Sequence, residues 1–298
     1  MSANPTLVPS ALPELFPPLR PQRGWIAFVR RHPMVALGAA LLTMIVLLAA
    51  LAPWLGTVDP TRISPIARGR VPSAAHWFGT DMLGRDLYSR VLYGARVSLT
   101  VGLAVAVLAS VLGLVIGTLS GFLRRLDGVL MRVMDGLMSI PPILLAIALA
   151  ALWRGSLGGV IVAIAVAEVP RVARLVRGVV LTLREQPFVD AAVAAGTCTP
   201  MIIWRHILPN LAATMTVQAT YICASAMIIE AILSFIGAGT PPTIPSWGNI
   251  MADGRAIWQV KPHMVLIPAV FLSLSVLAVN LLGDGMRDWL DPQQPQRI

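Results

Sequence analysis

The chain has 298 residues, of which 56% are hydrophobic and 12% are charged, and its formal net charge is +9. Soluble domains carry about 25% charged residues, so this composition excludes an ordinary soluble protein. The positive charge comes almost entirely from arginines that flank apolar segments, without the basic run and interleaved aromatic residues of a nucleic-acid surface. The sequence therefore predicts an all-α polytopic membrane protein that binds no nucleic acid.

Six apolar segments are expected to cross the lipid bilayer, because a helical crossing takes about 20 apolar residues. They are residues 34–54, 98–122, 136–153, 156–170, 213–237 and 264–283. The first segment is too long for a signal peptide and lacks a small-residue cleavage site, so we interpret it as a retained anchor. The fourth segment is short for a full crossing.

The distribution of basic residues predicts the orientation, since cytoplasmic segments are enriched in arginine and lysine. With the N-terminus inside, the inner segments carry 14 basic residues and the outer segments carry 9. Six transmembrane helices put both termini on one side, and this bias favours the N-in, C-in arrangement. The parts are then a cytoplasmic N-terminal tail, an anchor helix, an extracytoplasmic segment, a core and a cytoplasmic C-terminal tail: 1–33, 34–54, 55–97, 98–285 and 286–298.

The extracytoplasmic segment before the second span admits two interpretations. Leu87 and Val91, with Arg90 and Arg96, fit an amphipathic helix that lies on the bilayer. The alternative is an interfacial connector with solvated charges.

The outer loop 238–263 is rich in glycine and proline before Trp247. Trp247 and Trp258 fit an aromatic belt at the membrane interface. Such a loop lines an outer mouth and meets a substrate-delivery protein, with Trp247 and Asp253 as candidate contacts, or it is a plain surface turn.

A polar loop at residues 186–210 predicts two short helices joined by a bend. Pro187 suits the first position of a helix, where its missing N–H does no harm. Asp190 falls in the first turn, where a carboxylate complements the helix dipole. Gly196 suits the left-handed position that follows a helix end.

The second short helix is expected to begin at Thr199-Pro200 and to stop before Pro209. The first helix has little side-chain bulk because it carries Ala191, Ala192, Ala194 and Ala195. A nine-residue helix is marginal in water, which favours a docking partner. A self-contained cytoplasmic helix hairpin is the alternative.

This loop resembles the "EAA" loop of ABC importer membrane subunits, which has the pattern Glu-Ala-Ala, three residues, Gly, nine residues, Ile, any residue, Leu-Pro. Here Asp190-Ala191-Ala192, Gly196 and Leu208-Pro209 stand at those distances. Two positions depart from the pattern. Asp190 replaces Glu and has a shorter reach, and His206 replaces Ile, as in the peptide-importer branch of the family.

Further motifs are similar to the C-type subunits of dipeptide and oligopeptide importers, and the resemblance runs from about residue 25 to residue 292. The motifs are Phe78-Gly79-Thr80-Asp81, Leu83-Gly84-Arg85-Asp86, Ser89-Arg90, Tyr93-Gly94, Arg96-Val97-Ser98-Leu99, Pro245-Ser246-Trp247-Gly248-Asn249, Asp253-Gly254-Arg255, Asn280-Leu281-Leu282-Gly283-Asp284-Gly285-Met286-Arg287-Asp288 and Leu290-Asp291-Pro292.

The resemblance implies a type I ABC importer permease fold in a bacterial inner membrane and a pore subunit for peptide uptake by alternating access. Its implied partners are a homologous B-type permease, two ABC ATPase subunits and an extracytoplasmic binding protein. Nickel, glutathione or opines are alternative substrates. The residues implied for ATPase coupling are Asp190, Ala191, Ala192, Gly196, His206, Leu208 and Pro209.

The sequence itself offers no ATP site, since the only lysine, Lys261, precedes Pro262 and cannot complete a P-loop. The four histidines are scattered and the two cysteines stand apart, so no metal site and no cofactor is expected. We therefore predict that the chain is not an enzyme and that ATP hydrolysis belongs to partner subunits.

Ionisable residues within the spans are the remaining candidates for chemistry. Glu230 is interpreted as a structural carboxyl bonded to Gln218 or Asn280, as a gate or pathway residue with Asn280, or as a proton-coupling site. Asp135 and Glu168 are expected to pair with nearby Arg132 or Arg171. A proton relay through these three acids would make an ion-coupled secondary transporter, and a non-transporting membrane scaffold is a third alternative.

Overall fold

A computed structural model describes residues 33–153 and 156–290, and their regular structure is helical apart from one isolated β-bridge. The predicted cytoplasmic tails lie largely outside these residues. The main helices are α2 Pro33–Ala50, α3 Leu87–Phe122, α4 Arg124–Met138, α5 Pro142–Leu152, α6 Leu157–Arg184, α7 Pro187–Ala194, α8 Thr199–Ile202, the π-turn Ile203–Ile207, α9 Leu208–Ile236, α10 Trp247–Gly254 and α11 His263–Leu290.

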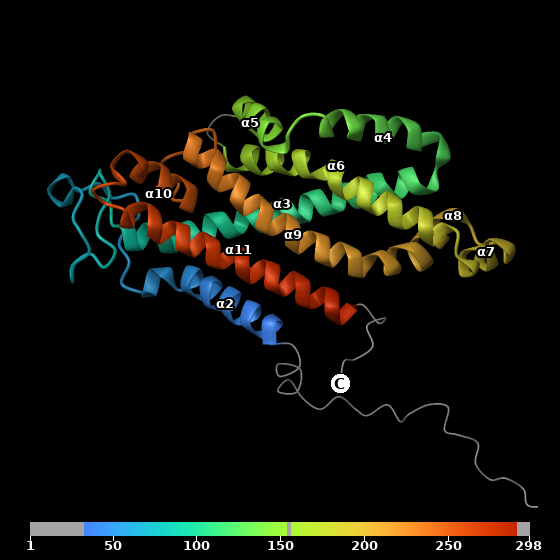
Figure 1. The fold of residues 1–298 in the computed structure, drawn as a ribbon, viewed down its shortest axis with the longest axis horizontal. Helices are drawn as coiled ribbons and strands as arrows, with labels where there is room; N and C mark the ends of the chain where they lie inside the picture. The colour runs from blue at the N-terminus through green and yellow to red at the C-terminus, as the bar shows by residue number, and fades with distance from the viewer. Residues whose placement is uncertain (1–32, 154–155, 291–298) are drawn as a thin grey trace, which may run out of the picture.

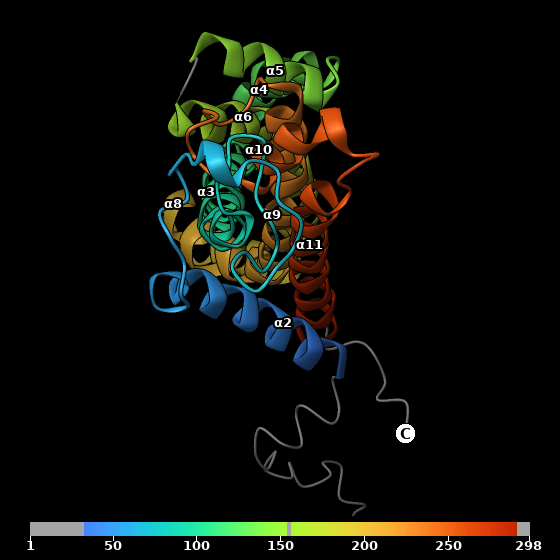
Figure 2. The ribbon, with the colours of Figure 1, turned by 90° about the vertical axis from the view of Figure 1, so that its left-hand side faces the viewer.

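The long helices form an elongated bundle with a distinct group of elements at each end (Figure 1). The segment 51–86 and α10 gather at one end, and α7 and α8 project from the other. We call these the outer and inner ends, following the predicted orientation. Helix α2 lies along the side of the bundle next to α11 (Figures 1 and 2).

The all-helical membrane fold predicted from composition is confirmed. Four helices in the described ranges are long and apolar enough to cross a membrane, namely α2, α3, Thr199–Ile236 and His263–Arg287. The pair α4 and α5 makes a fifth span if it is counted as one, with a bend of 91° between its halves. Helix α6 carries charged residues halfway along its length, so a count of six spans stays a prediction.

Close packing of α3 on α6 depends on three glycines four residues apart. A Cβ atom built at Gly113 would lie 2.4 Å from Val172 Cβ, and one at Gly117 would lie 2.5 Å from the carbonyl oxygen of Ala173. At Gly121 it would lie 2.7 Å from a methyl group of Val180. Small residues at this spacing let two helix backbones approach, which is the usual packing device inside membranes.

Helix α3 begins eleven residues before the predicted second span. The carboxylate of Asp86 caps it by accepting a hydrogen bond of 2.9 Å from the backbone N–H of Ser89. Leu87, Arg90 and Val91 are buried in the first turns of this continuous helix. The prediction of a surface helix before the second span is therefore wrong, because its apolar and charged faces are both covered by other elements.

Prolines at two sites change the predicted helix limits in opposite ways. The predicted span 136–153 breaks at Pro141-Pro142, where α4 ends and α5 turns away. Pro209 does not stop the second helix of the polar loop, since Thr199–Ile236 is continuous. The π-turn just before Pro209 widens the helix where a proline ring would otherwise clash with the preceding turn.

Candidate functional site

The short helix α7 at the inner end has the start that the sequence predicts. Pro187 is its first residue and Gln186 its N-cap, and Asp190 lies in its first turn. The side chain of Asp190 is exposed, as are those of Ala191 and Ala194 on the same helix. A carboxylate in the first turn is stabilised by the helix dipole and stays available to a partner.

Gly196 ends α7 with the backbone conformation that was predicted. Its φ is +78°, in the left-handed region that favours glycine. The N–H of Thr197 donates to the carbonyl oxygen of Ala192 at 3.0 Å, and the N–H of Gly196 donates to that of Val193 at 2.9 Å. This pair of bonds is a Schellman motif, which turns the chain sharply toward α8.

Buried apolar side chains fasten this inner loop to the bundle. Val189, Ile202, Ile207 and Leu211 each expose 2% of their surface or less and belong to the main hydrophobic core. Because the anchors flank Gly196 on both sides, the loop is held at its base while its tip stays open to solvent. The position of α7 is therefore mechanically tied to α6 and α9.

The exposed surface of the loop is more apolar than the alanine pattern alone suggested. Phe188, Val193, Met201 and Trp204 expose between 40% and 73% of their surface. These large residues were missed as candidates, although apolar side chains inside a polar segment were a usable signal. Together with the small alanines they form a surface suited to another protein.

The predicted coupling residues are split between this tip and its support. The ring of His206 lies 6.1 Å from that of Phe188 across the two halves of the loop. Leu208 is half-buried against the core, whereas Pro209 is exposed. Asp190 and the alanines thus share the tip, and His206 and Leu208 lie behind it.

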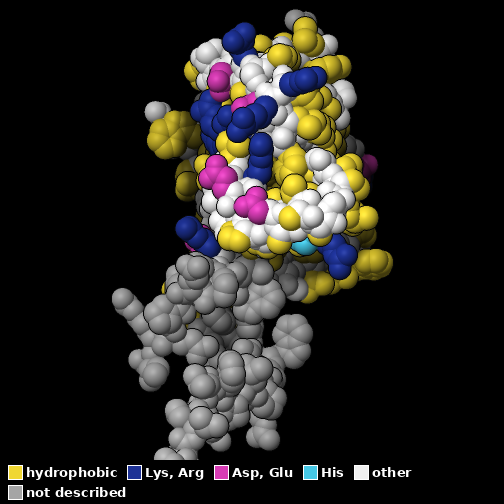
Figure 3. Space-filling model, turned by 90° about the vertical axis from the view of Figure 1, so that its right-hand side faces the viewer, with side chains coloured by type: hydrophobic (Ala, Val, Ile, Leu, Met, Phe, Trp, Pro, Cys, Tyr) yellow, Lys and Arg dark blue, Asp and Glu magenta, His cyan; other side chains and the backbone are white. Residues whose placement is uncertain are grey.

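A polar cleft of about 630 Å³ opens beside α7. Asp127 lies in it and accepts two hydrogen bonds from Arg177, at 2.6 and 2.7 Å. Arginines and acidic residues are interspersed on this end of the molecule (Figure 3). The cleft is lined by Ser120, Gly121, Arg124, Asp127, Leu181, Arg184, Glu185 and Asp190.

At the outer end, a buried cluster of four charges joins the segment before α3 to α10. Arg90 Nη1 lies 2.5 Å from Asp81 Oδ2 and 2.7 Å from Asp253 Oδ2. Arg85 bridges the same two carboxylates at 2.6 and 2.7 Å. Asp253 is 32% exposed and is the only one of the four with much solvent contact. It remains reachable from outside, as a candidate contact must be.

Trp247 cannot play the role predicted for it. Its side chain has no exposed surface, and its indole N–H donates to the carbonyl oxygen of Val91 at 3.1 Å. The predictions that it sits in an aromatic belt and contacts a delivery protein are both wrong, because α10 folds back onto α3. Trp258 is 59% exposed and remains compatible with the belt.

Glu230 lies near the outer end of α9 and is completely buried. Its Oε1 accepts a hydrogen bond from Ser234 at 2.7 Å and one from Thr240 at 3.3 Å. Neither Gln218 nor Asn280 is a partner, so that detail of the prediction is wrong. The carboxyl instead holds the α9–α10 connection against the end of α9.

Comparison with known proteins identifies the family of this chain. The sequence profile described as "Binding-protein-dependent transport system inner membrane component" matches residues 96–294. The chain belongs to this family. Its members are inner-membrane components of ABC transporters, so the chain is a multi-pass inner-membrane protein with an importer permease role.

Relatives of this permease cover nearly its whole length. A probable peptide ABC transporter permease of Sinorhizobium fredii is 52% identical over 91% of this chain and 93% of its own. The dipeptide permease DppC of Alkalihalophilus pseudofirmus is 39% identical over 89% and 88%. The glutathione permease GsiD of Salmonella typhimurium is 42% identical over 90% and 89%.

A solved structure confirms the type I ABC permease fold. An inward-facing structure of the MetNI methionine ABC transporter aligns with a TM-score of 0.56 at 21% identity. The alignment covers 67% of this chain and 96% of the MetNI chain. At this identity the likeness concerns the fold alone.

Glu168 and Asp135, the other two acids considered as candidates, pair with different arginines. Glu168 pairs with Arg171 at 3.3 Å, as predicted, whereas Asp135 pairs with Arg174 of α6 at 2.5 Å and not with Arg132. No hydrogen bond within the described ranges links Glu168, Asp135 and Glu230 to one another.

Proposed function

We propose that this permease is a pore-forming subunit of an ATP-driven importer for peptides and that its inner loop, residues 186–210, couples a separate ATPase to alternating access. The observation that carries the proposal is the shape of the loop. Its tip is exposed and carries both small alanines and large apolar side chains, while its base is anchored by buried residues in the core shared with α6 and α9. A docked partner that displaces the tip would therefore also move the spanning helices α6 and α9.

The partners follow from the class of transporter. A single permease chain forms half of a pore, so a homologous B-type permease completes it, and two ATPase subunits dock on the inner loops. An extracytoplasmic binding protein delivers substrate at the outer end, where Asp253 is a partly exposed candidate contact. Glu230 is proposed as a structural residue of the outer gate, and Asn280 of α11, which is half-buried, as a pathway candidate.

Peptide is the favoured substrate because relatives named as peptide or dipeptide permeases match at 52% and 39% identity over most of the chain. A relative named as a glutathione permease also matches at 42%. Glutathione is itself a peptide, so these names agree on a small peptide-like substrate.

Replacement of Ala191 and Ala194 by Gln tests the coupling loop. Both residues are exposed on α7 and three positions apart, so the longer side chains fit the isolated subunit and cost the helix only a few tenths of a kcal/mol. A docked ATPase should be pushed away. We expect the ATPases to be lost on purification and ATP-dependent dipeptide uptake in proteoliposomes to fall roughly tenfold or more, which corresponds to about 1.4 kcal/mol.

The matched control is Ala256→Gln at the opposite end, where the alanine is also exposed. Because it lies far from the inner loop, it should leave ATPase attachment on purification unchanged. Full uptake by the Ala191→Gln, Ala194→Gln double variant would remove the loop from the coupling path. Uptake by the permease without any ATPase would favour an ion-coupled transporter.

A further inference from the structure

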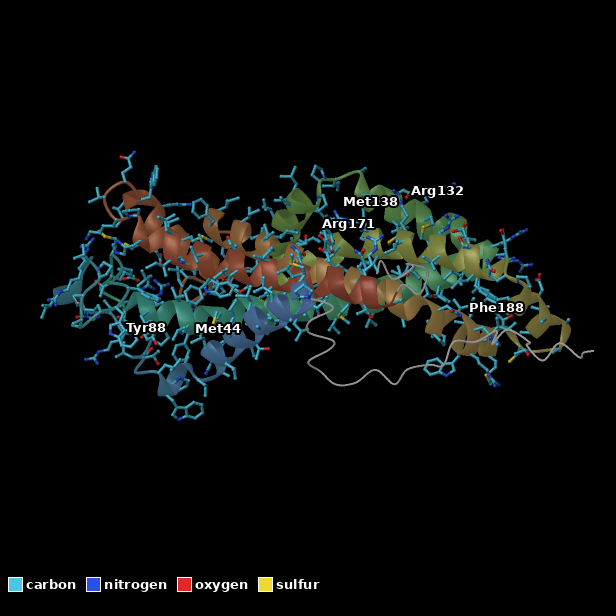
Figure 4. All side chains as sticks on the ribbon, turned by 60° about the horizontal axis from the view of Figure 1, so that its bottom comes forward. Met44, Tyr88, Arg132, Met138, Arg171 and Phe188 are labelled. Atoms are coloured by element: carbon cyan, nitrogen blue, oxygen red, sulfur yellow. The ribbon has the colours of Figure 1, made fainter. Side chains whose placement is uncertain are left out.

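Halfway along α6, the guanidinium group of Arg171 is only partly engaged in the packing of the bundle. Arg171 has a side chain that is 43% exposed, and its one ion pair within the described residues is a contact of 3.3 Å from Nη1 to Glu168 Oε2. An arginine offers five N–H donors, so most of them lack an acceptor among the described residues. Figure 4 shows Arg171 midway along the long axis of the molecule.

The neighbouring arginines of α6 are bound quite differently. Arg174 lies 2.5 Å from Asp135, and Arg177 makes two bonds to Asp127. Both acids belong to α4, so these arginines hold α4 against α6. Arg171 has no acid on α4, and its role is therefore separate from that packing.

Other side chains hold Arg171 in a defined orientation. Glu168 is 1% exposed, and its second oxygen accepts a hydrogen bond of 3.2 Å from Ser225 of α9. The guanidinium carbon lies 5.7 Å from the centre of the Tyr221 ring, within the range of a cation–π contact. Residues of α9 thus help to orient the arginine, while part of its guanidinium group stays exposed.

This part of α9 carries a polar stripe at helical spacing. Thr214, Gln218, Tyr221 and Ser225 recur every three or four residues, so they share one face. Gln218 Nε2 is buried without a partner in the described residues, and Tyr221 is 51% exposed. Thr220 points elsewhere, since its hydroxyl occupies the space beside Gly283 of α11.

This polar face of α9, together with Arg171, is unsuited to contact with lipid tails. Ionisable residues in membrane helices face water-filled cavities or the bundle interior because a charge in hydrocarbon is costly. The exposed face that carries Arg171 and Tyr221 is therefore expected to border water and not lipid. A planar guanidinium beside a phenol O–H matches a carboxylate, which accepts two parallel hydrogen bonds from arginine.

We propose that Arg171 and Tyr221 form a binding site on the translocation path for a carboxylate group of the transported substrate, such as the C-terminal carboxylate of a peptide. The inference rests on the proposed import function and names the group recognised within the membrane subunit. Glu168 and Ser225 are positioning residues that orient the guanidinium.

A cycle of two changes tests this site in the complete transport complex in proteoliposomes. One change is Arg171→Gln, and the other replaces the free carboxylate of a dipeptide by an amide. Any preference of the binding protein for a carboxylate appears in both the wild type and the variant and cancels in the ratio. Since a hydrogen bond to a charged group contributes strongly, we expect Arg171→Gln to slow uptake of the free dipeptide about tenfold or more and to leave uptake of the amide unchanged.

Equal losses for both peptides, or no loss for either, would overturn the inference. The matched control is Arg255→Gln, since Arg255 is also an exposed arginine stacked on an aromatic ring, 5.8 Å from Phe235, but at the outer end. It should treat both peptides alike. If the Gln variant does not assemble, Tyr221→Phe keeps the ring and should slow only the free dipeptide, several-fold.

Two more measurements separate other outcomes. A lipid phosphate could bind the same guanidinium, and the effect of Arg171→Gln would then follow the anionic lipid content of the vesicles and not the peptide carboxylate, which overturns the inference. Wild-type complex that accumulates neither peptide with ATP would contradict the import function itself. If the wild-type complex takes up both peptides and Arg171→Gln slows the uptake of both equally, the carboxylate site alone is contradicted.

Discussion

The carboxylate of Asp81 is the centre of the hydrogen-bond network that holds the outer end together. Two arginines share its Oδ2, while its Oδ1 accepts the backbone N–H groups of Leu83 and Arg85 at 2.8 and 2.9 Å. Arg90 is 1% exposed. Arginine keeps its charge under all ordinary conditions, so the loss of Asp81 would leave two buried cations, Arg85 and Arg90, with Asp253 as their one shared counterion in the cluster.

We therefore predict that Asp81→Asn lowers the free energy of unfolding by about 3 kcal/mol, the lower end for a broken buried ion pair. The amide keeps the shape and the Oδ1 bonds, so the loss reports on charge. Thermal melting of the detergent-solubilised subunit measures it as a lower Tm. Asp59→Asn is the control, since Asp59 is an exposed acid of the same segment; equal melting of both variants would deny the cluster its role.

At the scale of elements, the pair α3 and α6 forms the largest helix interface of the bundle. The interface is close because glycines of α3 face the backbone and β-branched residues of α6. Without a hydrophobic drive between helices in lipid, such van der Waals contact is a main source of association. Small increases in side-chain volume should therefore be costly here.

The same substitution at two glycines tests this packing. A Cβ atom at Gly117 meets the carbonyl oxygen of Ala173 at 2.5 Å, whereas one at Gly178 of α6 meets nothing within 4 Å. We expect Gly117→Ala to destabilise the subunit by about 1–3 kcal/mol through overpacking. Gly178→Ala should stabilise it by up to about 1 kcal/mol, because alanine is the better helix former. Melting curves that shift in the same direction would contradict this account.

At the scale of the whole molecule, the two ends of the bundle should lie on opposite sides of the membrane. Cys198 is exposed in the inner loop, and Cys223 is half-buried within a spanning helix. In a Cys223→Ser background without the ATPases, a membrane-impermeant maleimide should label Cys198 in inside-out vesicles only. Ala256→Cys, in a background without other cysteines, should react in right-side-out vesicles only. The reverse pattern would invert the topology.

The sequence by itself determined the features that depend on local chemistry. Apolar segments of sufficient length became helices, since a backbone in lipid must satisfy its own hydrogen bonds. The turn at Gly196 followed from the left-handed freedom of glycine, and the start of α7 from Pro187. These predictions held because each depends on neighbouring residues in the chain.

Tertiary structure alone decided the features that depend on distant partners. Arg90 is buried because Asp253, 163 residues away, supplies a counterion. Trp247 is covered because α10 packs on α3, whose carbonyl at Val91 takes its N–H. Arg171 contacts Glu168 of its own helix and Tyr221 of α9, and Ser225 of α9 in turn holds Glu168. Helical periodicity indicates that a helix has faces, but only the packed bundle decides which face is covered by protein and which stays exposed, because burial is set by what the other helices leave uncovered.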